Sequence, residues 1–264
     1  YLFTAVNKHH SIRNFSAALF KKPFYFAFIN IFIYFKRPLS ILIRYVFEVG
    51  NYPCQFFIRT PVGLQGATAY SHHDLITLVE CFGKLDYKVS QNISVVVDFG
   101  SNIGISALYF LTRNINVQVH LFEPVPRNIK RLRDNLKGYE NRYKLTECAI
   151  GTKEGEFDFS CEDSGRYGGL IEKDVESFHG SSSDRVITVK VLMANNVLRE
   201  ICEKHKTIDV VKIDVEGHEN KILRSLKKEI LSCVGRIYAE TENNQKIQGF
   251  SSERYGGLAR YYRT

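Results

Sequence analysis

The chain has 264 residues, of which 44% are hydrophobic, and it carries a formal net charge of +8. This length allows one large domain with an appendage, and the hydrophobic content excludes a chain that is disordered by composition. The charge is concentrated at the start. Residues 1–50 hold seven Lys or Arg against Glu48 alone, which is seven minus one, or +6, and leaves +2 for the rest.

Six cysteines are scattered singly along the chain. None forms a Cys-x-x-Cys pair, and no Cys/His cluster has the spacing of a zinc site. Isolated cysteines in apolar surroundings are typical of buried thiols. The sequence therefore predicts a reducing, cytoplasmic compartment.

Residues 24–35 are almost entirely aromatic or aliphatic, and a basic pair flanks them on each side. These twelve residues are too few to span a bilayer as a helix, which needs about 20. Two interpretations of this basic aromatic extension, residues 1–50, stay open. It is a helix on an anionic membrane surface, or a helix packed on the domain or on a second copy in a homodimer. Nucleic acid is not an expected partner, because the aromatics are too densely consecutive.

Residues 51–264 are expected to form the main domain, which starts with two short strands over 56–60 and 67–70. Ser71, with Asp74 three residues later, has the form of a capping box, although the acid is Asp rather than Glu. The helix that follows should turn four apolar side chains inward, namely Leu75, Leu78, Val79 and Phe82.

The most informative segment is VVVDFGSNIG, residues 95–104. An apolar β-branched run ends in Asp98, and Gly100-x-x-x-Gly104 separates it from an apolar helical pattern over 105–111. Glycines let the backbone approach a ligand closely, and the helix start directs N–H groups at it. A dinucleotide fingerprint reads G-x-G-x-x-G. The spacing here better fits a nucleoside ligand held by its amino-acid end.

A second apolar run, residues 117–122, ends in Glu123, which lies twenty-three residues after Gly100. An acidic residue at the end of the second strand, about 20 residues past the glycine turn, is placed to accept hydrogen bonds from both ribose hydroxyls. We therefore expect Glu123 to bind a ribose.

A third motif, IDVVKIDVEGHE, covers residues 208–219. Its apolar run predicts a buried strand, which Lys212 interrupts. Because an unpaired buried charge is very costly, Lys212 should pair with a carboxylate, either Asp98 or Glu240. The strand leads into a loop that carries Asp214, Glu216, His218 and Glu219, at the edge where open α/β sheets bind ligands.

From residue 94 onward, strand and helix patterns alternate, which is typical of a parallel sheet covered on both faces. A polar stretch over 161–184, with Ser164, Arg166 and Tyr167, is interpreted as a substrate loop or lid. Only 24 residues, rich in Ser, Gly, Arg and Tyr, follow Glu240, so we expect an incomplete sheet edge. The expected strands are 94–98, 117–122, 143–149, 156–159, 186–191, 207–213 and 235–240, and the expected helices are 103–113, 126–137, 194–203 and 219–230.

The segments VVVDFGSNIG, LFEPVP and VVKIDVEGHE, in this order, resemble the FkbM methyltransferases over roughly residues 94–240. Ser101 stands where that family usually has alanine. The resemblance implies an α/β, Rossmann-like class I methyltransferase fold with a mostly parallel sheet, and S-adenosyl-L-methionine as cofactor. Asp98, Gly100, Ser101, Asn102 and Gly104 would then bind its methionine end, Glu123 its ribose, and Pro124 and Ala149 would flank its adenine.

The acidic loop supplies the candidates for catalysis. Asp214 is favoured as the base or the acceptor anchor, His218 is second because it titrates near neutrality, and Glu216 is a third candidate. Glu219 is expected to cap the following helix. No carboxylate spacing forces a metal site, so we expect no required metal.

The resemblance implies O-methyl transfer to a hydroxyl of a glycan or a secondary metabolite. A competing hypothesis is a non-catalytic scaffold that contacts a membrane or a partner through its N-terminal segment. An N-methyltransferase acting on nucleic acid would carry an Asn/Asp-Pro-Pro-Tyr type motif where this chain has Asp214-Val215-Glu216-Gly217.

Overall fold

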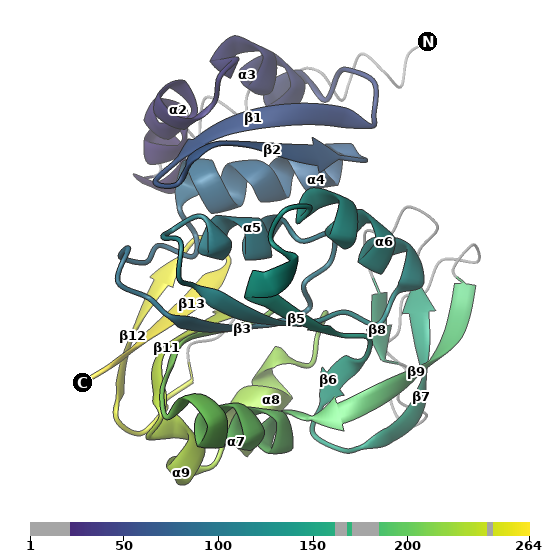
Figure 1. The fold of residues 1–264 in the computed structure, drawn as a ribbon, viewed down its shortest axis with the longest axis vertical. Coiled ribbons are helices and arrows are strands. Elements are labelled where there is room, and N and C mark those ends of the chain that lie inside the picture. The colour runs from purple at the N-terminus through teal and green to yellow at the C-terminus, as the bar shows by residue number, and fades with distance from the viewer. Residues whose placement is uncertain (1–21, 162–167, 171–184, 242–244) are drawn as a thin grey trace. The chain divides into compact units, whose positions relative to one another are not determined.

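A computed structural model describes residues 22–161, 168–170, 185–241 and 245–264 (Figure 1). The chain divides into two compact units, Tyr1–Val89 and Ser90–Thr264. The loop expected to carry Ser164, Arg166 and Tyr167 lies outside the described residues.

The first unit combines helices with one antiparallel hairpin. Its β1 and β2 pair from Cys54 opposite Ala69 to Thr60 opposite Gly63. The Asn30 side chain donates to the Gly83 carbonyl at 2.7 Å, which ties the first described helix to a π-helical turn. The elements are α2 (Lys22–Tyr34), α3 (Pro38–Phe47), β1 (Cys54–Thr60), β2 (Gly63–Ala69), α4 (His72–Leu78) and the π-helical turn (Val79–Lys84).

The start of α4 confirms the expected cap. The Ser71 hydroxyl accepts the Asp74 N–H at 3.3 Å, and the Asp74 carboxylate accepts the Tyr70 N–H at 2.7 Å. The two side chains therefore satisfy donors at the helix entrance, where backbone N–H groups lack helical partners. As predicted, Leu75, Leu78, Val79 and Phe82 are buried.

The second unit is built on a seven-stranded sheet in the order β12-β13-β11-β10-β3-β4-β5. The central strands run parallel, and β13 is antiparallel to β11. This is the expected class I methyltransferase fold. Its strands are β3 (Val95–Phe99), β4 (Gln118–Phe122), β5 (Tyr143–Thr146), β10 (Ile208–Ile213), β11 (Val234–Glu240), β12 (Phe250–Tyr255) and β13 (Leu258–Arg263).

Helices cover both faces of this sheet, as the alternating pattern predicts. Figure 1 shows α5 and α6 on one face and α7, α8 and α9 on the other. The expected single helix over 219–230 is divided in two. The helices are α5 (Ile105–Leu111), α6 (Pro126–Asn135), α7 (Ala194–His205), α8 (Glu219–Ser225) and α9 (Lys228–Leu231), with a 3₁₀ turn at Glu140–Arg142.

The expected incomplete edge is wrong, because the β12–β13 hairpin completes the sheet. The buried positions of this hairpin include aromatic and charged side chains and are not a run of aliphatic ones. Tyr261 is fully buried. Buried Arg260 pairs with Glu253 at 3.2 Å and stacks on Tyr255 at 3.7 Å from the ring centroid. A search for apolar alternation does not detect such a strand.

A smaller sheet in the order β6-β9-β7-β8 belongs to the same unit. The expected strand over 143–149 is interrupted after Thr146, and Ala149 starts a strand of this second sheet. The strands expected over 156–159 and 186–191 are confirmed and are longer. The members are β6 (Ala149–Gly151), β7 (Gly155–Cys161), β8 (Gly168–Leu170) and β9 (Arg185–Met193).

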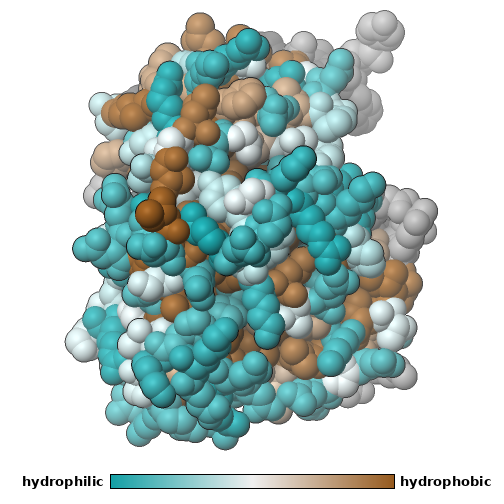
Figure 2. All heavy atoms as spheres, viewed as in Figure 1, coloured by the Kyte–Doolittle hydropathy of each residue, from teal (hydrophilic) through white to brown (hydrophobic). Residues whose placement is uncertain are grey.

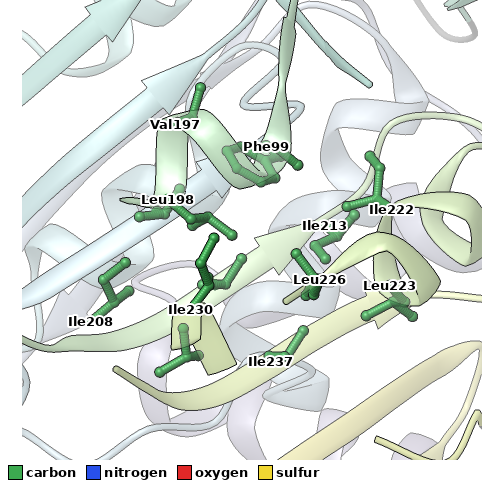
Figure 3. Packing of buried hydrophobic residues seen from close by; sticks show 14 of the residues in the cluster. Phe99, Val197, Leu198, Ile208, Ile213, Ile222, Leu223, Leu226, Ile230 and Ile237 are labelled. Carbon is green, nitrogen blue, oxygen red and sulfur yellow. The ribbon is translucent and has the colours of Figure 1, made fainter. Parts of the chain in front are cut away.

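The core beneath the sheet packs strand side chains against α7, α8 and α9 (Figure 3). Phe99, Ile213 and Ile237 from the strands and Leu198 and Ile222 from the helices belong to this cluster and are fully buried or nearly so. Burying one such side chain contributes about 1.5–3 kcal/mol. The core holds the strands rigidly, so the polar residues that follow them have fixed positions.

Candidate active site

The three sequence motifs end at the same edge of the sheet, because β4, β3 and β10 are neighbours. Phe99 lies opposite Phe122 on one side and opposite Ile213 on the other. The residues that follow are therefore brought together. The glycine turn, Glu123 and the acidic loop all begin at this edge.

The glycine turn approaches the acidic loop so closely that only glycine fits. Gly100 has a φ of +78°, and a Cβ built on it would lie 1.7 Å from the Asp214 carbonyl oxygen. The N–H groups of Gly100 and Ser101 both donate to the Phe122 carbonyl, at 3.0 Å each. Gly100 was expected to let the backbone approach a ligand; the close approach in the structure is to the backbone of Asp214, and the ligand contact stays a prediction.

Ser101 connects the ends of two strands. Its hydroxyl donates to the Asp98 carbonyl at 2.9 Å and accepts the Phe122 N–H at 3.1 Å. The residue is 1% exposed. Serine, where the family that the sequence resembles usually has alanine, therefore adds two buried hydrogen bonds to the turn.

Asp98 is completely buried, and both of its carboxylate oxygens contact protein groups. Oδ2 accepts the Ser106 hydroxyl at 2.6 Å, and Oδ1 pairs with the Lys212 ammonium at 3.0 Å. Burial raises the pKa of Asp98, and Lys212 and Ser106 oppose that effect. Ser106 was not predicted from the sequence. It could have been noticed as a small polar residue in the first turn of an otherwise apolar helix.

Lys212 joins the glycine turn to the acidic loop. Its ammonium lies 3.0 Å from Asp98, 3.2 Å from Asp214 and 2.9 Å from the Gly100 carbonyl. Burial by itself lowers the pKa of Lys212, but the carboxylates of Asp214 and Asp98 raise it above its ordinary value. Asp98 was one of the two partners expected from the sequence, and Asp214 was not expected.

Glu123 faces the glycine turn. Its Oε2 accepts the Asn102 N–H at 2.9 Å, and its Oε1 accepts the Val125 N–H at 3.0 Å and the Asn128 side-chain amide at 3.2 Å. A carboxylate has about four acceptor sites, so it can still accept from a ligand. Burial raises the pKa of Glu123 to about 7, although these three donors lower it.

The acidic loop is closed by Glu219. Its carboxylate accepts the N–H of Val215 at 2.9 Å and of Gly217 at 3.0 Å. Glu219 therefore holds the loop before α8, instead of capping the helix as expected. His218 is the residue that precedes the helix.

Two carboxylates of this loop reach the solvent. The Asp214 side chain is 28% exposed, and Glu216 is more exposed and has a φ of +55°. Desolvation against the loop, followed by repulsion from Asp214 and Glu219, raises the pKa of Glu216 to about 8. The loop therefore offers one carboxylate fixed by an ammonium and one that titrates near neutral pH.

The remaining predicted residues lie at the borders of the site. Pro124 follows Glu123 and is partly buried. Ala149 is buried at the start of β6 and pairs with Val191. Asn102 has a φ of +46°, and Gly104, with a φ of +83°, packs against Leu132. The roles assigned to these four residues stay predictions.

Glu123 should make the stability of the free protein depend on pH. Its pKa rises from 4.5 to about 7 on folding, so between these values the folded state binds more protons than the unfolded state. The free energy of unfolding should therefore fall, by about 3 kcal/mol in total, as pH rises through this window. Urea denaturation at about pH 5 and about pH 8 measures the change. Glu123→Gln should remove the share of Glu123 and leave that of Glu216, whose pKa is also raised, so an equal change in both proteins would contradict the assignment.

A family model described as "Methyltransferase FkbM domain" matches residues 98–254, more than half of the chain. The chain belongs to this family. The resemblance seen in the sequence is confirmed, and the expected class, an S-adenosylmethionine-dependent methyltransferase, is that of the family. The cofactor of this family is S-adenosylmethionine.

Two curated relatives match the chain. The 2-O-methyltransferase NoeI of Sinorhizobium fredii is 27% identical over 164 residues, which cover 59% of this chain and 66% of that protein. The methyltransferase sdnD of Sordaria araneosa is 26% identical over 178 residues, 55% of this chain and 65% of that protein. The chain thus spans just under two thirds of the length of these relatives.

Among solved structures, a methyltransferase from Geobacter sulfurreducens matches with a TM-score of 0.39 and 13% identity, over 75% of this chain and 82% of that chain. A likeness at this level adds nothing to the family assignment.

The residues at the sheet edge fit the family's cofactor. The side-chain oxygens of Asn102 and Asn128, beside Glu123, are buried and have no hydrogen-bond partner among the described residues. A buried acceptor without a donor costs about 1–3 kcal/mol. A ligand that supplies hydroxyl or ammonium donors would relieve that cost, and S-adenosylmethionine carries both. Asn128 was not predicted from the sequence. Its position, an amide five residues after Glu123, could have indicated a place beside that carboxylate.

Proposed function

We propose that the chain is an S-adenosylmethionine-dependent O-methyltransferase acting on a hydroxyl of a glycan or a secondary metabolite. One observation carries the proposal. A single buried ammonium, that of Lys212, contacts both the glycine turn and Asp214. The motif that would hold the donor and the motif that would hold the acceptor therefore form one site.

The cofactor, when bound, supplies a methyl group on a positively charged sulfur. The protein's task is to align the acceptor oxygen with that carbon, because positioning provides much of the rate. Glu123 would accept hydrogen bonds from the ribose, and the glycine turn would hold the amino-acid end.

Of the two roles considered for Asp214, the acceptor anchor is favoured. Its pairing with Lys212 at 3.2 Å holds the carboxylate in place at the sheet edge, where it can accept a hydrogen bond from an acceptor hydroxyl. Glu216 is the better-matched base, because a group with a pKa near 8 is both available and basic close to neutral pH. His218 stays a second candidate for the base.

The acceptor class rests on similarity. The name of one relative specifies 2-O-methyl transfer, which supports a hydroxyl acceptor. All six cysteines are free thiols, which supports the proposed cytoplasmic compartment. These points leave the acceptor itself to be found by screening.

Glu216→Gln tests the proposed base. Removing a general base should lower the turnover number by about 10²–10⁴-fold, with the affinity for S-adenosylhomocysteine changed only slightly. The measurement is formation of S-adenosylhomocysteine in the presence of a panel of hydroxyl-bearing saccharides and polyketides. Glu229→Gln, an exposed glutamate on α9, is the matched control. Full turnover in both Glu216→Gln and Asp214→Asn would contradict the proposed chemistry, and donor binding without turnover on any acceptor would favour the scaffold.

A further inference from the structure

One half of helix α2 is apolar and exposed. Residues spaced i, i+3, i+4, i+7 and i+8 lie on one helix face, and here all five are large and solvent-exposed. The opposite half, with Ala27 and Ile31, is buried within the first unit, as is Phe35 directly after the helix. The exposed set is Tyr25, Phe28, Ile29, Phe32 and Ile33, with Phe26 beside it.

Helix α3 carries a second exposed apolar stripe. Leu39, Ile43 and Phe47 are spaced i, i+4 and i+8, and Leu39 is 64% exposed. Figure 2 shows hydrophobic side chains at the surface of the unit that contains these helices. Large exposed apolar patches mark interaction sites, and each of these stripes gathers several large apolar side chains on one helix face. We name the two stripes together the α2–α3 face.

Basic residues accompany this face. Lys36 and Arg37 form the turn between the two helices, and both are exposed. Exposed Arg59 donates to the carbonyls of Ile33 and Phe35, at 3.3 and 3.1 Å, so it lies at the end of α2. Over residues 22–60 the sequence has five basic residues against one acidic residue. The partner should therefore be anionic at its surface and apolar beneath.

We propose that the α2–α3 face docks on the surface of an anionic phospholipid bilayer. Exposed aromatic and aliphatic side chains enter the interfacial region, and flanking Lys and Arg attract acidic headgroups. No helix among the described residues is long and apolar enough to cross a membrane, so the contact is with one surface. A second copy of the chain fits less well, because it would bring a net positive charge against a net positive charge.

Vesicle sedimentation of the full chain tests the proposal. The protein should pellet with phosphatidylcholine vesicles that contain phosphatidylserine, and added salt should reduce the bound fraction. Phe28→Ser/Phe32→Ser, which removes a contacting ring pair, should weaken partitioning at least about tenfold. Ile115→Ser/Val186→Ser, which removes two exposed apolar side chains of the second unit, should leave it unchanged.

The charge requirement is tested separately. Lys36→Glu/Arg37→Glu should also release the protein from acidic vesicles, whereas the control Lys153→Glu/Lys228→Glu, with the same change in net charge, should not.

Equal binding by all variants, or no binding by the wild type, would overturn the proposal. A dimer in analytical ultracentrifugation that Phe28→Ser/Phe32→Ser abolishes would identify a second copy as the occupant. A fall in melting temperature in that variant, without vesicle binding by the wild type, would show that another part of the chain covers the face.

Discussion

Replacing Lys212 with methionine is expected to lower the free energy of unfolding by about 3–5 kcal/mol, the usual cost of breaking a buried ion pair from one side. Lys212 is 2% exposed and Asp98 is completely buried. Without the ammonium, Asp98 keeps only the Ser106 hydroxyl among the residues that the structure describes, and the Gly100 carbonyl loses a donor. Urea denaturation followed by circular dichroism measures the loss.

Two further variants separate this effect from a general loss of charge. Asp98→Asn combined with Lys212→Met should recover part of the stability, because no uncompensated carboxylate then remains buried. Arg133→Met is the control: Arg133 pairs with Glu147 at the surface, and such exposed pairs contribute about 0–1 kcal/mol. If Lys212→Met cost no more than Arg133→Met, the buried network would not exist as described.

Gly100→Ala is the second substitution with a large expected effect. The added methyl carbon would lie 1.7 Å from the Asp214 carbonyl oxygen, so β3 and β10 would have to separate at the edge where the site is built. We expect a loss of at least about 2–3 kcal/mol in the free energy of unfolding. The affinity for S-adenosylhomocysteine should also fall, because the turn and the acidic loop are displaced together.

Gly138→Ala is the matched control for this substitution. Gly138 has a φ of +92°, similar to that of Gly100, but an added Cβ would meet nothing within 4 Å. Gly138→Ala therefore measures the loss in the free energy of unfolding that the left-handed backbone alone causes, about 1–2 kcal/mol. A similar loss in the two variants would mean that the close approach of Gly100 to Asp214 does not matter.

The site residues at the strand ends could be predicted from the sequence, because neighbouring parallel strands bring their carboxyl ends together at one edge of the sheet. Asp98, Glu123 and Asp214 each directly follow or end an apolar run, so their proximity was predictable from local patterns alone. The family motifs added expected roles for these residues, but they specify residue types rather than contacts.

Side-chain partners were harder to predict, because they depend on the register between distant segments. Lys212 and Asp98 are paired in register across β10 and β3, and their contact was one of two alternatives. The second contact of Lys212, with Asp214, and the closure of the acidic loop by Glu219 depend on how the chain turns after β10. No periodicity encodes that turn.

The terminal hairpin was missed for a different reason. Hydrophobic alternation assumes that buried positions are aliphatic, but β13 buries Arg260 beside Tyr261. The arginine is tolerated because Glu253 neutralises it and Tyr255 stacks on it. These partners come from the neighbouring strand, so they become visible only once the two strands are paired.

Titration calorimetry with S-adenosylhomocysteine tests the central claim, that Glu123 and the glycine turn hold the family's cofactor. The wild type and Glu200→Gln, an exposed control on α7, should bind with equal affinity. Glu123→Gln should bind about 10- to 100-fold more weakly, which corresponds to the loss of charge-assisted hydrogen bonds worth about 1.5–3 kcal/mol. Equal affinity in all three proteins, or no binding by the wild type at about 100 μM ligand, would contradict the account.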